Sequence, residues 1–154
     1  MAGDTQYTGK VQTVLGMISA DSLGITLTHE HLLWDMGAWR VECSEAGERG
    51  RSYQSLTLEN LGWNLANRFK NVDDMQLLDE SIAIKEALLY KIAGGGTIAE
   101  VSSIGLSRDP LGLARISRAT SLNIVMGSAY YIGASHSPEL KRMSVERDCR
   151  DDCT

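Results

Sequence analysis

Extended and helical patterns alternate along the chain between positions 25 and 132, and this alternation constrains the fold more than any other feature of the sequence. Runs typical of β-strands occupy residues 25–32, 97–103 and 122–132. Apolar residues at helical spacing fill residues 73–93, and Asp109-Pro110 supplies a cap and a first-turn proline for a second helix. Strands that alternate with helices form parallel sheets, because each helix crosses over to the next strand. We therefore expect an α/β fold with about three parallel strands and crossover helices.

Three further segments complete this outline. Residues 11–15 predict a short strand that turns, and the glycines at 94–96 predict the end of the first helix. Residues 38–72 are polar and dotted with glycine, so they predict a long loop or a partly helical excursion. An excursion of that length is typical of a lid or a pocket wall.

The composition excludes several classes of protein. With 154 residues, of which 43% are hydrophobic and 23% charged, the chain is typical of one soluble globular domain. A net charge of -5 and scattered Lys and Arg residues argue against a nucleic-acid partner. The polar start predicts neither a signal peptide nor a membrane anchor, and polar residues interrupt the uncharged stretch 119–138. These polar residues lead us to expect no membrane partner. Because the three cysteines form no disulfide framework, we also expect a cytoplasmic protein.

His29 and His31 stand two residues apart in the strand-like run 25–32. Side chains alternate between the faces of a strand, so we expect both imidazoles on one face and Glu30 on the other. Neutral imidazole is a common zinc ligand, but a catalytic zinc takes three protein ligands and a water. The spacing fits two ligands of a metal, and it equally fits two buried, hydrogen-bonded histidines of structural importance.

Several segments, taken in order, resemble the phosphotriesterase family of the amidohydrolase superfamily. They are residues 9–16, 23–32, 99–103, 107–109, 113–119, 123–131 and 142–146. The resemblance implies the N-terminal portion of a (β/α)8 TIM barrel, a fold that typically takes ~250 residues. We therefore expect an incomplete barrel, with residues 1–146 as part of the hydrolase domain and residues 147–154 as a polar tail. A truncation or a frame change is our hypothesis for that tail.

The resemblance implies a metal-dependent hydrolase in which a hydroxide held between two divalent metals attacks the substrate. His29 and His31 match the first-strand ligands of the more buried metal, and the complete enzyme is expected to hold binuclear zinc. Tyr131 matches an aromatic position of the pocket wall, Tyr130 lies beside it, and Trp39 is a third candidate for substrate binding. No further catalytic residue is assigned.

The resemblance leaves the substrate open. Ester-type bonds are expected first, in a small phosphotriester, lactone or carboxylic ester, since the metals stabilise the charge that develops on oxygen. One alternative is an amide-hydrolysing family member, and another is a non-enzymatic truncated homologue that only associates with partners. The complete enzyme could be a homodimer. We expect the chain alone to be inactive, because an open parallel sheet leaves an unpaired edge and an uncovered apolar face.

Overall fold

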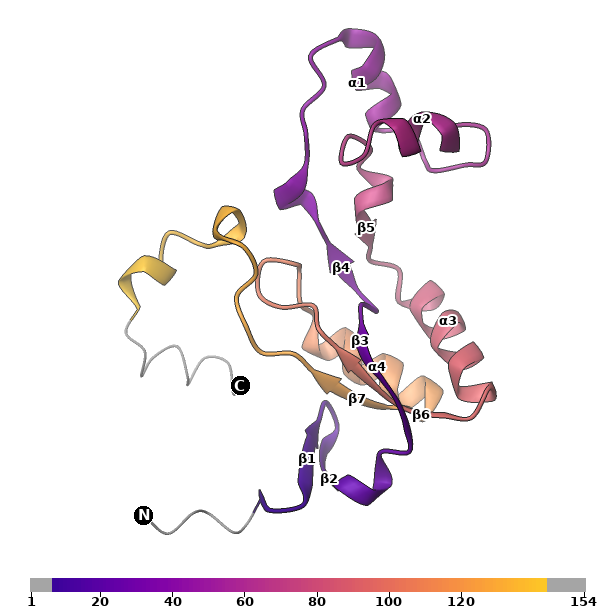
Figure 1. The fold of residues 1–154 in the computed structure, drawn as a ribbon, viewed down its shortest axis with the longest axis vertical. Helices are drawn as coiled ribbons and strands as arrows, with labels where there is room; N and C mark the ends of the chain where they lie inside the picture. The colour runs from indigo at the N-terminus through magenta and orange to yellow at the C-terminus, as the bar shows by residue number, and fades with distance from the viewer. Residues whose placement is uncertain (1–6, 144–154) are drawn as a thin grey trace.

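A parallel sheet of three strands, in the order β3-β6-β7, forms the centre of the molecule (Figure 1). The structure is a computed structural model that describes residues 7–143. The sheet and its crossover helices are β3 (Ile25–Glu30), α3 (Glu80–Ile92), β6 (Gly95–Glu100), α4 (Pro110–Thr120) and β7 (Asn123–Met126). The two pairings within the sheet are both parallel. The expected α/β architecture, with three parallel strands and crossover helices, is confirmed.

The remaining elements are short and lie around the sheet (Figure 1). They are β1 (Lys10–Thr13), β2 (Gly16–Ser19), the 3-10 helices η2 (Ala20–Ser22), η3 (Gly37–Trp39), η4 (Asp73–Met75), η5 (Gly133–Ser135) and η6 (Leu140–Arg142), β4 (Trp34–Asp35), β5 (Gln76–Leu77), α1 (Ala46–Ser52) and α2 (Leu61–Ala66). β1 and β2 form an antiparallel hairpin. The hairpin joins the sheet where the Val14 amide donates to the Ile124 carbonyl, 2.9 Å away.

Residues 34–77, which we call the arm, leave the sheet after β3 and return before α3 (Figure 1). The antiparallel pair β4 and β5 forms the base of the arm, and α1 and α2 lie toward its far end. The expected excursion over residues 38–72, partly helical, is therefore present. Its service as a lid or a pocket wall stays a prediction.

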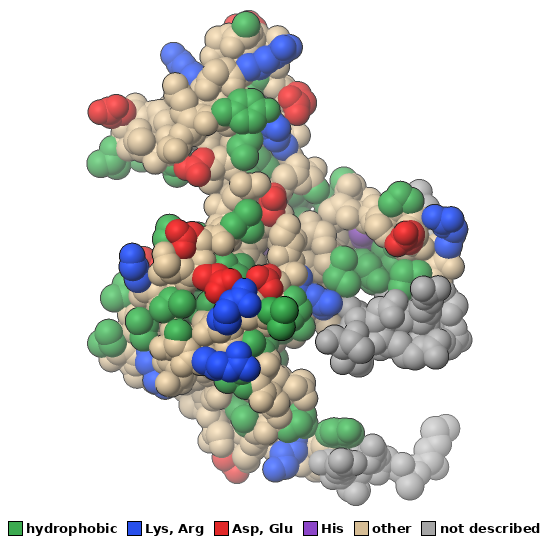
Figure 2. Space-filling view, turned by 180° about the vertical axis from the view of Figure 1, so that it is seen from behind, with side chains coloured by type: hydrophobic (Ala, Val, Ile, Leu, Met, Phe, Trp, Pro, Cys, Tyr) green, Lys and Arg blue, Asp and Glu red, His purple; other side chains and the backbone are tan. Residues whose placement is uncertain are grey.

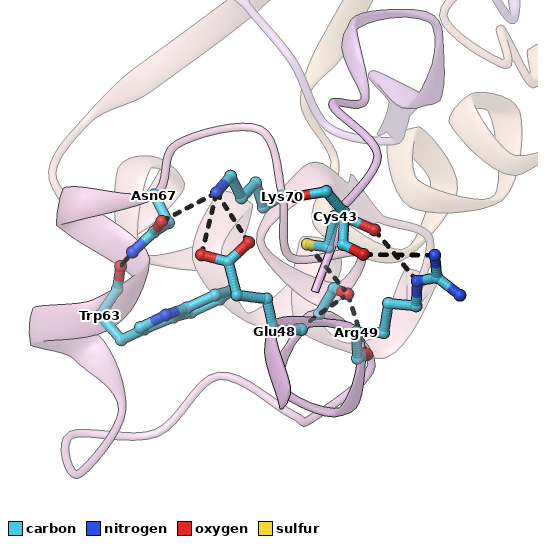
Figure 3. A network of polar contacts seen from close by, with 8 residues as sticks. Cys43, Glu48, Arg49, Trp63, Asn67 and Lys70 are labelled. Atoms are coloured by element: carbon cyan, nitrogen blue, oxygen red, sulfur yellow. Dashed lines mark hydrogen bonds and ion pairs between the residues drawn. The ribbon is translucent and has the colours of Figure 1, made fainter. Parts of the chain in front are cut away.

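Polar contacts hold the far end of the arm together (Figure 3). The Lys70 ammonium group lies 3.1 Å from Glu48 Oε2 and 3.1 Å from Asn67 Oδ1. Arg49 of α1 donates through Nε to the Cys43 carbonyl at 3.1 Å. These bonds connect α1 with Cys43, in the segment before it, and with Lys70, in the segment after α2. They order a region with few buried apolar side chains.

The main hydrophobic core lies between the sheet and its two crossover helices. Its buried members are Leu32, Leu33, Ala83, Ala87, Ile98, Leu113, Ile116, Leu122 and Ile124. Burying a Leu or Ile side chain in full stabilises a fold by roughly 1.5–3 kcal/mol. The ends of β3 and β6 are thus anchored by packing on one side, which fixes the segments that follow them.

The surface opposite the view of Figure 1 carries mixed charge. Basic and acidic side chains alternate over it, and no broad area of one sign is visible (Figure 2). Arg115 of α4 pairs with Glu80 of α3 and lies 3.7 Å from Asp109. Within residues 7–143, no helix combines the length and the apolar character needed to cross a bilayer.

The first crossover helix is shorter than its periodicity predicts. We expected it over residues 73–93, but α3 begins at Glu80. The cause is Asp79, whose carboxylate accepts a 2.7 Å hydrogen bond from the Ser81 amide and so caps the helix. Residues 73–77 form a 3-10 turn and β5 instead.

The buried face of α3 also differs from the predicted one. Its buried residues are Ala83 and Ala87, small side chains that suit close packing. The larger apolar residues Leu89 and Ile92, which the spacing assigned to the core, are 63% and 81% exposed. Periodicity predicted that a helix lies here and where it ends, but neither its start nor the face that packs inward.

The strands are shorter than their sequence patterns predict. β3 ends at Glu30, β6 runs over Gly95–Glu100 in place of 97–103, and β7 stops at Met126. The glycine run therefore ends α3 only at Gly94, which has a φ of +98°. Beyond the strands the pairing becomes irregular: it continues as single hydrogen bonds, such as that from the Val101 amide to the Glu30 carbonyl, and as one parallel bridge between Ile104 and Tyr130. Residues 144–146, the end of the last segment that resembles the family, and the tail 147–154 lie outside the described residues.

Gly96 occupies a position that only glycine fits. Ile25 pairs with Gly95 and Thr26 with Thr97, so Gly96 is an extra residue in the ladder. A Cβ atom built on Gly96 would lie 2.4 Å from the Leu23 carbonyl oxygen, well inside van der Waals contact. The obstacle is backbone, which cannot rotate away as a side chain could.

We expect Gly96→Ala to lower the free energy of unfolding by about 1–3 kcal/mol, as overpacking does in well-packed regions. Urea unfolding followed by circular dichroism measures this change. Gly50→Ala is the matched control, because its Cβ meets nothing within 4 Å in α1. Helix propensity should make that control more stable by roughly 0.5–1 kcal/mol. Equal midpoints for the two variants would contradict the packing argument.

Candidate metal and substrate site

A cavity of about 330 Å³ opens at the carboxyl ends of β3 and β6. Its walls are His29, His31, Trp34, Met36, Val101, Leu106 and Tyr131. Ligands of parallel α/β sheets bind beyond the carboxyl ends of the strands, where the connecting loops diverge. The position of the cavity is therefore that of a substrate pocket.

His29 and His31 enter this cavity together. Their ring centroids lie 5.7 Å apart, and the ring planes meet at 75°. Leu27 pairs with Ile98 and Glu30 with Glu100, so β3 contains one residue more than β6 just at this point. Irregular pairing of this kind is frequent beside functional sites, where it redirects a side chain. Both imidazole rings line the same cavity, in agreement with the expectation that they lie on one face of the strand.

The environment of His31 favours its neutral form. Burial lowers the pKa of its imidazole most, the neighbouring His29 lowers it further, and Glu30 opposes both. The Nδ1 atom lies 2.9 Å from the Ser102 hydroxyl oxygen. Because Nδ1 is occupied, Nε2 is the ring nitrogen left for a ligand in the cavity, and neutral imidazole is the form that binds metals.

Glu100, the last residue of β6, is fully buried, at 0% exposure, and bonds to the segments that follow β3 and β6. Its Oε1 accepts from the Leu32 amide at 3.3 Å, and its Oε2 accepts from the Ser102 amide at 3.1 Å. Burial raises the pKa of the Glu100 carboxyl group, while hydrogen bonds from the Ser102 hydroxyl and from these two amides oppose the shift. The carboxylate thus ties the turn after β3 to the turn after β6.

The donor set fits part of a zinc site. Two imidazoles converge in one cavity, and imidazole nitrogen is a preferred zinc ligand. Among residues 7–143, no third His, Cys, Asp or Glu joins them in a cluster able to hold a metal. A catalytic zinc needs three protein ligands, so His29 and His31 fit two of these positions. Their role as ligands stays a prediction.

Tyr131, a lining residue of the cavity, is hydrogen-bonded to Trp39. Tyr131 lines the cavity, whereas Trp39 lies behind it and donates through Nε1 to the Tyr131 hydroxyl group at 3.1 Å. The Trp39 ring stacks on Phe69, with centroids 6.0 Å apart and planes at 27°. Phe69 has a φ of +66°, and its carbonyl accepts from the Val41 amide at 2.8 Å. Trp39 thus links the arm to Tyr131, one of the residues that line the cavity.

Tyr130, the third candidate for substrate binding, is directed elsewhere. It is not among the residues that line the cavity. Its ring meets His136 edge to face at 5.9 Å, and its hydroxyl group lies 3.9 Å from the Met143 sulfur. The structure thus brings Tyr131 to the histidines and leaves Tyr130 in the adjoining loop. Whether any of the three aromatic residues contacts substrate stays a prediction.

Sequence reasoning missed several residues of the site. Trp34, Met36, Val101 and Leu106 line the cavity without having been singled out. Trp34 lies in the two-residue strand β4, and the other three lie in irregular segments after β3 and β6, where no periodicity points to a common surface. Glu100 did carry a signal, because a carboxylate interrupts an otherwise uncharged run of strand residues.

Comparison with known proteins places the chain in a family. The model of the phosphotriesterase family matches residues 9–149. The chain belongs to the phosphotriesterase family. Among curated relatives, N-acetyltaurine hydrolase of Homo sapiens is 40% identical over 147 residues, and that of Danio rerio is 37% identical over 148 residues. Each match covers 93% of this chain but 41% of the relative, so the chain spans about two fifths of the length of these phosphotriesterase-family hydrolases.

Solved structures of the phosphotriesterase family agree with this placement. A resiniferatoxin-binding protein from Rhodobacter sphaeroides is 31% identical, with a TM-score of 0.86 over 94% of this chain and 40% of that protein. A lactonase from Listeria monocytogenes shares the fold at 22% identity and a TM-score of 0.57, over 87% of this chain and 33% of its own. The parallel sheet described above is thus the counterpart of part of a phosphotriesterase-family TIM barrel.

We expect a measurable coupling between Trp39 and Tyr131. Trp39→Phe keeps an aromatic ring on Phe69 and removes the indole donor, and Tyr131→Phe removes the acceptor hydroxyl. Since a hydrogen bond contributes about 0.5–1.5 kcal/mol, and this one is partly exposed, the double-mutant coupling should be about 0.5–1 kcal/mol in urea unfolding. Trp63→Phe combined with Tyr131→Phe is the control and should be additive. Additivity in the first cycle would contradict the contact.

Proposed function

We propose that this chain supplies the first-strand metal ligands of a hydrolase site that cleaves an amide or ester-type bond in a small molecule. The observation that carries the proposal is the convergence of His29 and His31 in one cavity at the carboxyl ends of parallel strands. Membership of a family of hydrolases supports the reaction class. The irregular pairing before Glu30 supports the role of both rings as ligands, and the Ser102 contact supports that of His31.

Five of the seven residues that line the cavity have a part in this proposal. His29 and His31 hold a divalent metal, which supplies Lewis acidity and activates water for hydrolysis when bound. The apolar side chains of Met36 and Leu106 exclude bulk water from the site and contact the apolar part of a substrate. Tyr131, held by Trp39, presents an aromatic face at the mouth.

The substrate proposal gives the amide alternative more weight than the sequence did. Ester-type bonds were expected first, but the curated relatives with the stated 37–40% identity are named N-acetyltaurine hydrolase. Amide and ester carbonyls undergo the same attack by activated water, so one site accommodates either bond. We therefore propose a small amide as substrate, with lactones and esters as secondary candidates.

The chain alone is proposed to lack turnover. Within the described residues, β3 and β7 each pair with one strand, and on the far side of β7 the hairpin bonds to the Ile124 carbonyl, so both strands keep unpaired edge positions. Two metal ligands also do not complete a catalytic zinc site. Those edges, with Leu89 and Ile92 exposed, also support the second candidate function, association with another chain without catalysis. Binuclear zinc, a homodimer of the complete enzyme and a cytoplasmic location belong to the same proposal.

Metal titration tests the assignment of the two histidines. Zn²⁺ added to the chain should bind weakly and report on both rings, and His29→Ala or His31→Ala should each weaken binding by at least tenfold, because one imidazole remains. Isothermal calorimetry measures the affinity. His136→Ala is the control, since His136 lies outside the cavity, and should leave the affinity unchanged.

The same samples test the prediction that the chain is inactive. With Zn²⁺ or Co²⁺ added, hydrolysis of N-acetyltaurine, a lactone and a carboxylic ester should stay at the rate of the metal salt alone. Turnover that is lost in His29→Ala would contradict this expectation and support the site. Zinc binding that survives both alanine substitutions would overturn the assignment of the ligands.

A further inference from the structure

We propose that a second cavity, formed by the arm alone, binds a small zwitterion with an apolar body, such as an α-amino acid with an aliphatic side chain. The cavity has a volume of about 280 Å³, and we call it the arm groove. It is lined by five apolar residues and by Asn64, Arg68 and Asp74. Met36 is the one lining residue that it shares with the cavity of the two histidines. The proposal therefore goes beyond the proposed function and does not rest on the metal ligands.

The apolar residues of the arm groove are Met36, Leu61, Leu65, Phe69 and Met75. Met75 is buried, whereas Leu61, Leu65 and Phe69 remain exposed although they are large and apolar. Apolar side chains that stay exposed around one hollow are typical of ligand-binding grooves. Pockets for drug-sized ligands measure about 300–1,000 Å³, so the arm groove suits a smaller molecule. The aliphatic side chain of an amino acid would cover these apolar residues.

Asn64 of α2 contributes a buried oxygen atom that lacks a hydrogen bond. The residue lines the arm groove and is 3% exposed. Its Nδ2 atom donates to the Asn60 carbonyl oxygen at 3.2 Å and to Asn60 Oδ1 at 3.0 Å. Among the described residues, no donor reaches Asn64 Oδ1. A buried acceptor without a donor costs free energy, because folding has removed it from water.

The orientation of both carboxamide groups follows from their partners. The Thr57 amide can only donate, so the Asn60 atom that lies 2.9 Å from it is Oδ1. Asn60 Nδ2 in turn donates to the Ser55 carbonyl at 2.8 Å. Asn64 therefore faces two acceptors of Asn60, and Nδ2 is the atom that it must turn toward them. The unpaired atom of Asn64 is thus an acceptor, and a ligand in the arm groove is placed to supply the missing donor.

Two opposite charges complete the lining of the arm groove. Arg68 and Asp74 are both exposed. Within residues 7–143, neither side chain makes a hydrogen bond or an ion pair. A guanidinium group donates to an anionic group, and a carboxylate accepts from an ammonium group. An ammonium group carries three donors, which suffice for Asp74 and for Asn64 Oδ1. A zwitterion therefore complements both charges, whereas a ligand with one charge leaves Arg68 or Asp74 without a partner.

The experiment titrates L-leucine into the ¹⁵N-labelled full chain at neutral pH and follows ¹H–¹⁵N spectra. Leucine should bind saturably and shift the side-chain amide signals of Asn64 together with the backbone signals of the arm groove. Leucinamide lacks the anionic group, and 4-methylpentanoate lacks the ammonium group. Each should bind about two- to fivefold more weakly than leucine, which is the contribution of one exposed ion pair.

Two variants assign the charges of the ligand to individual residues. Arg68→Gln should weaken leucine binding by about two- to fivefold and leave leucinamide binding unchanged. Asp74→Asn should weaken leucine binding to the same extent and leave 4-methylpentanoate binding unchanged. A merely structural role of either residue would weaken all three ligands alike. Arg118→Gln is the matched control, because Arg118 is an exposed arginine of α4 outside the arm groove, and it should change none of the affinities.

The ligand series on the unaltered chain decides the proposal even if a variant fails to fold. Equal affinities for leucine, leucinamide and 4-methylpentanoate would overturn it, and so would the absence of saturable leucine binding. Leucine binding without a shift of the Asn64 side-chain signals would contradict the site. Light scattering tests whether a second copy of the chain covers the arm groove instead. A dimer that Leu65→Asp dissociates would replace the proposed ligand by that copy.

Discussion

The parallel pairing of β3 with β6 determines where everything else in this molecule can lie. Because the two strands run the same way, both end at one edge of the sheet, and their last residues, Glu30 and Glu100, are partners in register. The bonds continue past the strands: the Val101 amide donates to the Glu30 carbonyl at 2.9 Å, and the Asp35 amide donates to the Leu106 carbonyl at 3.0 Å. Two irregular segments are thereby held side by side, and the cavity forms between them.

The order of elements and the pairing of the two histidines were accessible from the sequence, since both depend on local periodicity. Alternation with period 2 predicts that His29 and His31 share a face, and the structure places both rings in one cavity. The irregular pairing before Glu30 was not accessible, because it depends on how two distant strands align. The same holds for Ser102, whose importance arises from a neighbour 71 positions away.

Boundaries and buried faces were less accessible, for a different reason. Asp79 and Glu80 could be recognised as a helix start, yet the apolar residues before them extended the pattern and obscured the cap. The choice of Ala83 and Ala87 as the inward face of α3 depends on how closely the helix approaches its neighbours. Side-chain size at that contact is decided by tertiary packing, which hydrophobic spacing does not encode.

At Phe69 the backbone conformation is unfavourable, while the side chain makes a contact that the cavity wall depends on. A left-handed conformation costs a residue with a Cβ atom roughly 1–2 kcal/mol, and an asparagine or glycine would avoid much of that cost. Either replacement would remove the ring on which Trp39 rests. The arm thus keeps the conformational cost of the Phe69 backbone, which an element without this ring contact would not need. A replacement of Phe69 that stabilises the arm would remove the support of Tyr131, the cavity residue 62 positions further along the chain.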